Sequence, residues 1–449
     1  MAVDDEFKDT TQPTNQDGDT EPMRWLYVFV IGLGFFTTGV SWSVYNSYLP
    51  ADFLPTFIGG SLQNTIIGLI MVLDNIVALF LQPYIGARSD AKRSRFGRRM
   101  PYILIGTPTA AVFFALIAIG WAAFNFWLMF LFLTIFNVAM AYYRAPVVAL
   151  MPDVVPSKLR SKANGVINLM GGVGAIYAFA IASQIYKIQD PGLAAMFGIT
   201  PTQVGPILAF LTTSVIMVVA TIILYLVVKE PEVPPVDPDK PKEIGIVQAI
   251  RQVSFSTDRS AIGLLFAILF WFFGWNAMET WYTRYGREVL GFLTADASFQ
   301  LTAFALSFVV FAVPAGLVAG KIGRKQSILL GLIIMIAALV MLILTSNYLM
   351  MMLILVVAGF GWAFINVNSI VMVWEQLGKA RIGAGTGLYY LFSMTAAIFG
   401  PLVTGFIFDM TSLSLLFPVS IVFLIIAFIF MLGVRTGEIG DESISEIAQ

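Results

Sequence analysis

The sequence contains neither cysteine nor histidine among its 449 residues. These absences exclude disulfide bonds, thiol or imidazole catalysis, and the side chains that most often bind zinc and haem. The sequence also lacks a Gly-Lys-Ser/Thr phosphate-binding loop, which argues against ATP-driven chemistry. Charged residues are scarce, at 12% of the chain against roughly 25% in soluble domains. We therefore expect no cofactor and no metal site, and the net charge of −1 does not indicate a nucleic-acid partner.

Apolar residues are abundant instead and make up 58% of the chain. A helix needs about 20 predominantly apolar residues to cross a bilayer. Twelve such stretches are separated by polar breaks, and we predict spans at Trp25–Tyr48, Leu62–Ile85, Pro101–Ala122, Phe126–Leu150, Gly165–Tyr186, Pro206–Val228, Ala261–Trp281, Phe299–Ala319, Ser327–Leu344, Tyr348–Trp374, Thr386–Phe408 and Leu415–Val434. The predicted fold class is an all-α membrane protein with twelve transmembrane helices.

The positions of lysine and arginine predict the orientation, because positively charged loops are retained on the cytoplasmic side. If the loops alternate from a cytoplasmic N-terminus, only Lys187, Arg284 and Arg287 of the 26 basic residues fall outside, and Arg144 falls within a span. An even number of helices then returns the C-terminus to the cytoplasm. We expect a multi-pass protein of the plasma membrane, or of the inner membrane in a bacterium.

A proline-rich hydrophilic stretch that begins at Glu230 divides the sequence near its middle and suits a linker. The first residues are polar and acidic, without the apolar core of a cleavable signal peptide. The predicted organisation is a disordered tail at 1–22, a six-helix bundle at 23–228, a cytoplasmic linker at 229–260, a second six-helix bundle at 261–434 and a C-terminal tail at 435–449.

Both predicted bundles carry the same loop motifs, which indicates an internal repeat. The loop after the second span contains Gly86, Asp90, Arg95, Gly97, Arg98 and Arg99, and the loop after the eighth contains Gly316, Gly320, Gly323 and Arg324. The loop after the fourth span contains Asp153, Lys158, Arg160 and Gly165, and the loop after the tenth contains Glu375, Lys379, Arg381 and Gly385. An acidic residue, a lysine, an arginine and a glycine thus occur in the same order in both loops.

The loop from Gly86 to Arg99 resembles the motif between helices 2 and 3 of the major facilitator superfamily. The members of this superfamily are transporters built from two six-helix bundles. Within it, the stretch from Gln82 to Tyr102 resembles the sucrose and glucoside:proton symporters, which include the plant sucrose transporters and their bacterial and animal relatives. Arg144-Ala145, Trp271-Phe-Phe-Gly-Trp275 and Gly286-Arg-Glu-Val289 agree with that family, and a more distant likeness is to the galactoside:cation symporters. The resemblance implies sugar transport by a monomer, coupled to protons or to sodium.

The repeated loop charges predict a latch, because salt bridges beside helix-end glycines can exist in only one conformation of a rocking transporter. We expect Asp90, Arg98 and Asp153, with Arg160 as a candidate partner, to hold the cytoplasmic side closed in the outward-facing state. Gly320 lacks the carboxylate of Asp90, so the second-half latch should be weaker. The alternative is that these charges are solvated and only set the topology.

Charges inside the predicted spans are functional candidates, because each costs about 2.5 to 3.5 kcal/mol on insertion scales. Asp74 lies ~18 Å from Gly86 along the helix and Arg144 ~13 Å from Asp153, so the two could meet within one bundle. The alternative is a fixed ion pair that only tightens this bundle. Glu279 lies ~27 Å along its helix, where we interpret it as a gate or rim residue, or as an ordinary solvated helix end.

Asp74 is the predicted site of proton coupling, by elimination. The sequence has no histidine, and Leu133 stands where the sucrose transporters place an aspartate in helix 4. Asp74 is the one carboxylate near the midplane of the first bundle. We predict that Arg144 switches between Asp74 and a substrate-linked arrangement, with Glu279 as the next coupling candidate.

The resemblance implies that helices 1, 4, 7 and 10 line the substrate cavity. Sugar hydroxyls need amide or carboxylate partners, and the C–H faces of a sugar stack on aromatic rings. The candidate substrate-binding residues on these helices are Trp42, Tyr45, Asn46, Asn137, Tyr142, Trp275, Asn276, Trp362, Asn366 and Asn368. The aromatic residues could instead serve in packing or in interface belts. Asn137, Asn366 and Asn368 are the stronger candidates for substrate contact, because an amide in lipid needs a hydrogen-bond partner.

Two other functions stay open at this point. A transporter of this fold could instead export drugs or organic ions, and fold alone does not decide, because one fold serves many functions. A membrane enzyme or sensor would need a nucleophile with a base, a metal cluster or a large soluble domain, and the sequence shows none of them. The sequence therefore favours a sugar symporter that is not an enzyme.

Overall fold

The computed structural model describes residues 25–91, 94–155, 160–230, 259–377 and 382–435. Within these ranges the chain forms helices and no strand, and twelve helical segments are long and apolar enough to cross a membrane. The predicted fold class is thereby confirmed. Most of the predicted linker and of both predicted tails lies outside the described residues, as does Arg381.

The first six spans contain nine α-helices: α2 (Trp25–Tyr48), α3 (Gln63–Met71), α4 (Leu73–Ala91), α5 (Met100–Ala122), α6 (Phe126–Val154), α7 (Arg160–Ile176), α8 (Ser183–Tyr186), α9 (Pro191–Phe197) and α10 (Pro201–Val227). A π-helical turn at Leu49–Phe53 extends α2, and another at Tyr177–Ala182 joins α7 to α8. The last six spans are α12 (Ser260–Glu288), α13 (Thr294–Ile322), α14 (Arg324–Ile343), α15 (Tyr348–Leu377), α16 (Ile382–Met410) and α17 (Leu416–Leu432). The short helix α9 lies between two spans and was not predicted.

Local capping sets several helix ends. The Asn125 side chain accepts the backbone N–H of Leu128 at 3.0 Å and starts α6, because a side-chain oxygen there satisfies an otherwise unpaired donor. Thr200 and Gln203 form a reciprocal capping box at the start of α10. These polar side chains mark the helix boundaries within an otherwise apolar sequence.

Helix α12 continues seven residues beyond its predicted end at Trp281. Hydropathy ends a span at its first polar residues, but Thr283 and Arg284 are buried here and remain helical. Arg284 pairs with Glu288 one turn later through a 2.8 Å contact. The predicted boundary was therefore too short, because packing and pairing keep polar residues inside the helix.

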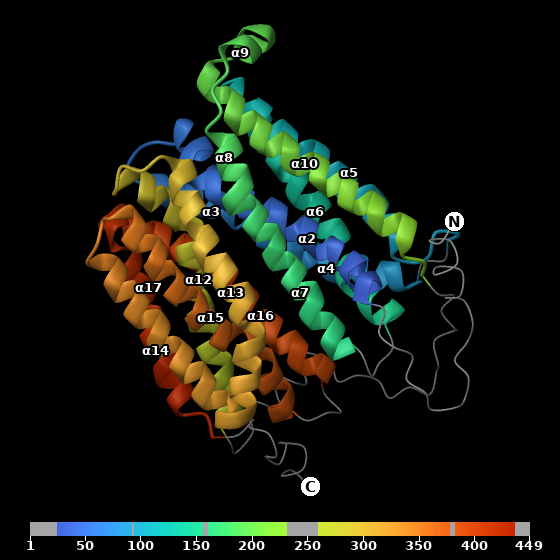
Figure 1. The fold of residues 1–449 in the computed structure, drawn as a ribbon, viewed down its shortest axis with the longest axis vertical. Coiled ribbons are helices and arrows are strands. Elements are labelled where there is room, and N and C mark those ends of the chain that lie inside the picture. The colour runs from blue at the N-terminus through green and yellow to red at the C-terminus, as the bar shows by residue number, and fades with distance from the viewer. Residues whose placement is uncertain (1–24, 92–93, 156–159, 231–258, 378–381, 436–449) are drawn as a thin grey trace.

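The chain folds into two helical halves that lie side by side in Figure 1, α2–α10 in blue to green and α12–α17 in yellow to red. They meet where α3 packs on α16, α7 and α8 on α13, and α2 on α12. Small residues bring α3 and α16 close: a Cβ on Gly68 would lie 2.7 Å from the Pro401 carbonyl oxygen, and one on Gly405 2.5 Å from that of Asn64.

Charged residues lie at both ends of the bundle formed by the two halves. The terminal face is the end at which α2 begins and α17 ends, and it carries Arg98 and Arg324. The distal face is the opposite end, where α2 ends and α12 ends, and it carries Asp52 and Arg287. Helix α9 marks the distal face at the top of Figure 1.

Candidate functional site

Charged residues of both halves lie where the halves meet. Asp74 sits in the first turn of α4, just after a one-residue break at Val72 that separates α3 from α4. Its carboxylate accepts a 2.9 Å hydrogen bond from the Asn75 amide. The charge of Arg144 on α6 acts on Asp74 and on Glu279 of α12. Among the described residues, no carboxylate oxygen lies within 4.0 Å of the Arg144 guanidinium, so the predicted Asp74–Arg144 contact is electrostatic rather than a closed ion pair.

Glu279 bridges the two halves. Its carboxylate accepts a 3.2 Å hydrogen bond from the Asn46 amide of α2, and the Trp275 side chain lies one turn before it on α12. The interpretation of Glu279 as a solvated helix end was wrong. Helix α12 extends nine residues beyond Glu279, so this carboxylate lies within the interface of the halves rather than at a rim.

A stack of aromatic rings lines the second half beside Glu279. The Trp275 ring lies between Phe304 of α13 and Trp362 of α15, with ring centroids 4.7 Å away on both sides. Phe272 meets the Trp362 ring edge-on at 5.6 Å. Both faces of the Trp275 ring are therefore covered by protein rings, and the stack forms an aromatic wall with polar indole edges.

Several polar side chains of the first half have buried atoms that form no hydrogen bond to the described residues within the usual distance, and three of these side chains lie close together on α2 and α6. They are the Trp42 indole N–H, the Tyr45 hydroxyl and both amide atoms of Asn137. Trp42 contacts the Tyr45 ring edge-on at 5.3 Å, and Asn137 is 1% exposed. Unpaired buried polar atoms are costly and uncommon. The Tyr45 hydroxyl and the Asn137 amide also act on each other, so the cluster on α2 and α6 combines polar groups that interact weakly among themselves.

The remaining candidate amides differ in their surroundings. Asn366 is half-buried and lies one turn after Trp362, on the same face of α15. The Asn276 amide donates to the Phe272 carbonyl of its own helix at 2.7 Å. Asn368 donates to the Ser327 hydroxyl of α14 at 3.1 Å and to the Phe364 carbonyl at 2.9 Å. The amide nitrogen of Asn368 is thus engaged between two helices of one half, which favours a packing role over the predicted contact with substrate.

Tyr142 also points away from the interface of the halves. Its ring packs against Tyr102 of α5 with centroids 5.3 Å apart, and it lies 3.1 Å from where a Cβ on Gly106 would be. The neighbouring Tyr143 faces α2 instead, where its hydroxyl contacts Thr37 at 3.3 Å. Tyr142 therefore leaves the set of candidate substrate contacts, since adjacent helical residues point in different directions.

The loop motif of the first half forms an ion-pair network at the terminal face. Arg98 pairs with Asp153 through a 3.0 Å contact of its Nε, and Arg99 pairs with Asp153 at 2.9 Å and with Asp90. Arg99 also donates to the Ser89 hydroxyl. The Asp153 hydrogen bond holds the pKa of Arg98 above its usual value, so Arg98 stays charged.

This network lies within one half: Asp90, Arg98, Arg99 and Asp153 belong to α4, to α6 and to the start of α5. In this conformation the pairs therefore brace one bundle. The predicted latch belongs to the outward-facing state and stays a prediction. Arg95 takes no part: it is exposed and its guanidinium lies 4.7 Å from the Phe96 ring centroid. The side chain of Arg160 and all of Arg381 lie outside the described part of the chain.

Glu230 belongs to this network and was missed by sequence reasoning, which placed it in the linker. Its carboxylate accepts the backbone N–H groups of Arg98, Arg99 and Met100 at 2.6 to 3.0 Å. These are donors at the start of α5, which has no side-chain cap of its own. Gly97 makes room for the carboxylate, with a φ of 93°. An acidic residue directly after a span was the available signal.

The second half repeats the loop in reduced form. Arg324 pairs with Glu375 at 3.2 Å, the match of Arg98 with Asp153. Gly323 has a φ of 91°, close to the value at Gly97. Gly86 faces Ala145 of α6, and Gly316 faces the matching Val367 of α15. The predicted repeat is therefore present in the geometry as well as in the sequence.

The distal face joins the halves directly. Asp52, after α2, pairs with Arg287 of α12 and accepts the Thr294 hydroxyl of α13 at 2.8 Å. Other contacts across the halves link Lys187 with Asp296, Ser47 with Ser298 at 3.1 Å, and Asn64 and Thr65 with Asp409 at 2.5 to 2.9 Å. Within the described residues, all ion pairs between the halves lie at this face. The distal face is closed.

The family model described as MFS/sugar transport protein matches residues 30–413. The general alpha-glucoside permease of Schizosaccharomyces pombe (strain 972 / ATCC 24843) is 24% identical over 283 residues, which cover 58% of this chain and 48% of the permease. The fosmidomycin resistance protein of Escherichia coli (strain K12) is 28% identical over 178 residues, which cover 39% of this chain and 42% of that protein. Each alignment thus spans less than half of the relative.

Solved structures share the fold. A bacterial homolog to the human lysosomal transporter Spinster, in an inward-facing and unoccupied conformation, matches with a TM-score of 0.73 at 17% identity, over 93% of this chain and 98% of its own. A D-xylose-proton symporter matches with a TM-score of 0.63 at 17% identity, over 90% of this chain and 96% of its own. Because the family match extends across nearly all of the spans, the chain belongs to the MFS/sugar transport protein family and is a multi-pass membrane transporter of the secondary type.

Proposed function

We propose that this protein carries a sugar or glucoside across the plasma membrane together with a proton, by alternating access between its two halves. The proposal rests on Asp74, Arg144 and Glu279, whose charges act on one another, together with the hydrogen bond of Glu279 to Asn46 across the halves and the aromatic stack around Trp275. Charge at membrane depth is retained for a function. A stack of indole rings beside it suits a neutral, hydroxyl-rich substrate.

Each half has its own role in this proposal. The first half supplies the proton site at Asp74, with Arg144 as the group that favours or opposes its charge. The first half also supplies hydrogen-bonding groups at Asn46 and Asn137, and the second half supplies Asn366 and the rings of Trp275 and Trp362. Substrate bound between them would contact both halves, and binding would then be linked to their relative movement.

The relatives support the substrate class. A general alpha-glucoside permease is among the curated relatives, and a D-xylose-proton symporter carries the same fold. The resemblance from Gln82 to Tyr102 points to the same class. Glucosides are therefore the first substrates to test, with protons as the first coupling ion and sodium as the second.

Transport by the purified protein tests the proposal directly. Liposomes that contain the full chain are loaded at one pH and diluted into another, with labelled glucosides and monosaccharides outside. We expect one or more sugars to accumulate above the external concentration with an inward proton gradient, and to equilibrate only when the gradient is collapsed. Accumulation driven by sodium alone would change the coupling ion, and no uptake of any sugar would reject the substrate class.

The orientation is a separate part of the proposal. We infer that the terminal face is cytoplasmic, so that the closed distal face makes this conformation inward-facing. Reporter fusions after Arg99, Lys242 and Lys325 should report the cytoplasm, and fusions near Lys187 and Arg287 the opposite side. A cytoplasmic signal near Lys187 would contradict the orientation.

Alternating access can be tested with disulfides, because the chain has no native cysteine. The Ser47 and Ser298 hydroxyls lie 3.1 Å apart across the halves at the distal face. The double variant Ser47→Cys/Ser298→Cys should stop transport when oxidised and regain it on reduction. Each single cysteine variant is the matched control and should be insensitive to oxidation. Full transport by the cross-linked protein would reject a distal opening step.

Drug export is the second candidate, because the fosmidomycin resistance protein is 28% identical over its aligned residues. An exporter would lower the cellular concentration of an organic anion at the expense of a proton gradient. Expression in a drug-sensitive bacterial strain distinguishes the two functions. Resistance to fosmidomycin without sugar uptake would favour export, whereas sugar uptake without resistance would favour the symporter.

A further inference from the structure

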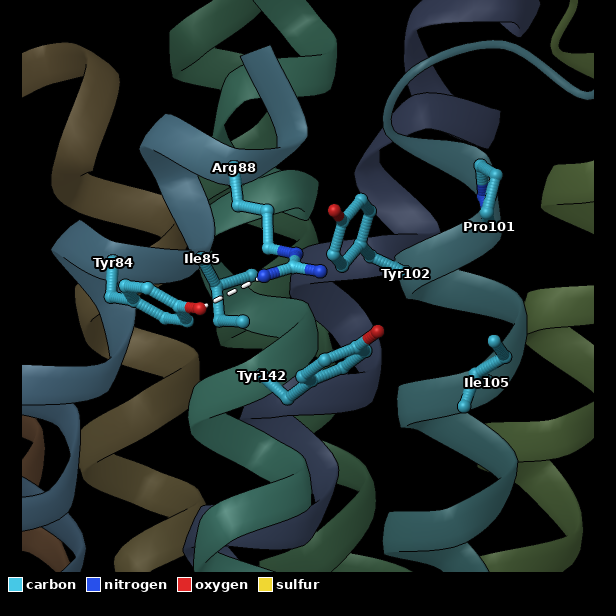
Figure 2. Close-up of a pocket in the computed structure, with 7 residues that line it drawn as sticks. All are labelled: Tyr84, Ile85, Arg88, Pro101, Tyr102, Ile105 and Tyr142. Carbon is cyan, nitrogen blue, oxygen red and sulfur yellow. Dashed lines mark hydrogen bonds between the residues drawn. The ribbon is translucent and has the colours of Figure 1, made fainter. Parts of the chain in front are cut away.

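A groove opens on the first half near the terminal face. It lies between α4 and α5, which both pack on α6, and has a volume of about 350 Å³. Its lining residues are Tyr84, Ile85, Arg88, Pro101, Tyr102, Ile105 and Tyr142. Figure 2 shows the Arg88 guanidinium directed toward the space between the three tyrosines, with Pro101 and Ile105 along the α5 wall.

Arg88 takes no part in the neighbouring ion-pair network. Its neighbours Ser89 and Asp90 both bind Arg99, whereas the Arg88 guanidinium donates to the Tyr84 hydroxyl at 2.9 Å. Among the described residues, no carboxylate oxygen lies within 4.0 Å of it. Arg88 therefore presents a positive charge in the groove that the protein does not neutralise there.

The internal repeat shows that the fold does not require these polar residues. The two halves can be aligned by their motif residues, with Gly86 on Gly316, Gly97 on Gly323 and Asp153 on Glu375. In this alignment the four polar residues that line the groove match apolar residues of the second half. The matches are Tyr84 with Pro314, Arg88 with Val318, Tyr102 with Ile328, and Tyr142 with Phe364. Phe364 and Val318 belong there to an apolar cluster with Phe311 and Phe360. Apolar side chains of the second half thus occupy the position that corresponds to the charged groove of the first half.

The groove also lies at the level of a lipid headgroup. Arg88 is three residues from the end of α4, and Pro101 is the second residue of α5, so the polar end of the groove is at the edge of the membrane. Ile105 is 61% exposed and continues the wall toward the membrane interior. A phospholipid whose phosphate lies at Arg88 would therefore have its acyl chains along an apolar helix surface.

We propose that this groove binds an anionic phospholipid of the leaflet at the terminal face. The headgroup phosphate accepts hydrogen bonds from Arg88 and from the Tyr102 hydroxyl, and an acyl chain lies against Ile105 and the Tyr142 ring. Basic pockets between transmembrane helices recognise anionic headgroups in this way. The volume suits a headgroup, since sites for small molecules begin at about 300 Å³. The lipid would join α4 to α5 next to the brace formed by Arg99.

Native mass spectrometry of the delipidated full-length protein tests this site. The protein is incubated with equal amounts of phosphatidylglycerol and phosphatidylcholine that have the same acyl chains. We expect the protein to retain phosphatidylglycerol preferentially, and Arg88→Gln to reduce this retention about fivefold. Ile105→Trp should reduce it as well without any change of charge, because the larger side chain fills the groove.

Matched controls keep the result specific. Arg95→Gln removes the same charge from an exposed arginine of the same loop region and should retain phosphatidylglycerol as the unmodified protein does. Equal retention of both lipids, or an equal loss in Arg95→Gln, would overturn the proposal. Full displacement by soluble glycerol phosphate would also overturn it, because the site would then recognise a free phosphate rather than a lipid. Melting temperatures of all variants confirm that each one is folded.

Discussion

The two halves carry the same loop motif and use it to different extents. In the first half, Asp153 joins Arg98 and Arg99, and Arg99 reaches Asp90 as well. In the second half, Arg324 pairs with Glu375, and Gly320 stands where the first half has Asp90. The turn itself is the same, with φ values of 93° and 91° at the motif glycines. The repeat therefore preserves the backbone turn, while the number of charges differs between the halves.

A second difference between the halves lies inside the membrane. When Asp153 is aligned with Glu375, Arg144 of the first half matches Asn366 of the second. When Gly86 is aligned with Gly316, Asp74 matches Phe304. Phe304 stacks on Trp275. Where the first half has two opposite charges, the second half has an amide and an aromatic ring. This difference motivates our proposal that the first half couples the proton and that the second half contributes the aromatic part of the sugar site.

The largest expected effect tests that assignment. Asp74→Asn removes a titratable group and should abolish accumulation driven by a pH gradient while sugar exchange continues, because the amide cannot carry a proton. Uptake and counterflow in liposomes measure the two activities separately. Arg144→Ala should impair both. If Asp74→Asn still concentrates sugar, coupling lies elsewhere, and Glu279→Gln is the next variant to measure.

The terminal-face networks should differ in their contribution to stability. The Asp153 side chain is 10% exposed and holds two arginines, so Asp153→Asn should destabilise by about 3 to 5 kcal/mol, the usual cost of breaking a buried pair. The Glu375 side chain is 41% exposed, and Glu375→Gln should cost about 1 kcal/mol or less. Thermal unfolding in detergent compares the two. Equal losses would remove the distinction between the halves.

The amides provide a third test with an internal control. Asn137→Ala and Asn366→Ala should each weaken sugar affinity roughly 5- to 150-fold, the loss of one buried hydrogen-bonded group. Asn368→Ala should leave affinity unchanged and lower the melting temperature instead, because Asn368 bonds Ser327 within the second half. Equilibrium binding and thermal unfolding of all three variants provide the measurements. A loss of affinity in Asn368→Ala alone would reverse these assignments.

The smallest expected effect concerns the cap of α5. Glu230→Gln keeps the side-chain size but weakens the acceptor for three backbone N–H groups. We expect a destabilisation of about 1 kcal/mol, typical of a lost cap, with faster hydrogen exchange at Arg98, Arg99 and Met100. Exchange at the start of α6, which the Asn125 side chain caps instead, serves as the control. Unchanged exchange at α5 would show that the carboxylate is not needed.

The number of spans, the repeat and the location of Asp74 and Arg144 within spans were predictable from the sequence. Apolar length alone identifies a spanning segment, because a bilayer excludes unpaired backbone groups and admits helices of a fixed minimum length. The order of acid, arginine and glycine in the loops revealed the repeat. Rare charges within such segments stand out for the same reason. These features are local in the sequence, so no knowledge of neighbouring helices was needed to find them.

The partner of each polar side chain was decided only by the tertiary structure. Tyr142 faces α5, Asn368 faces α14, and Glu279 meets Asn46 of the other half. Glu230 caps a helix that begins far earlier in the chain. In a helix that is apolar on all sides, hydropathy does not indicate which face meets which neighbour. The rotation of each helix about its axis therefore determined which side chains meet. As a result, one copy of the repeat is rich in charged contacts and the other in aromatic contacts.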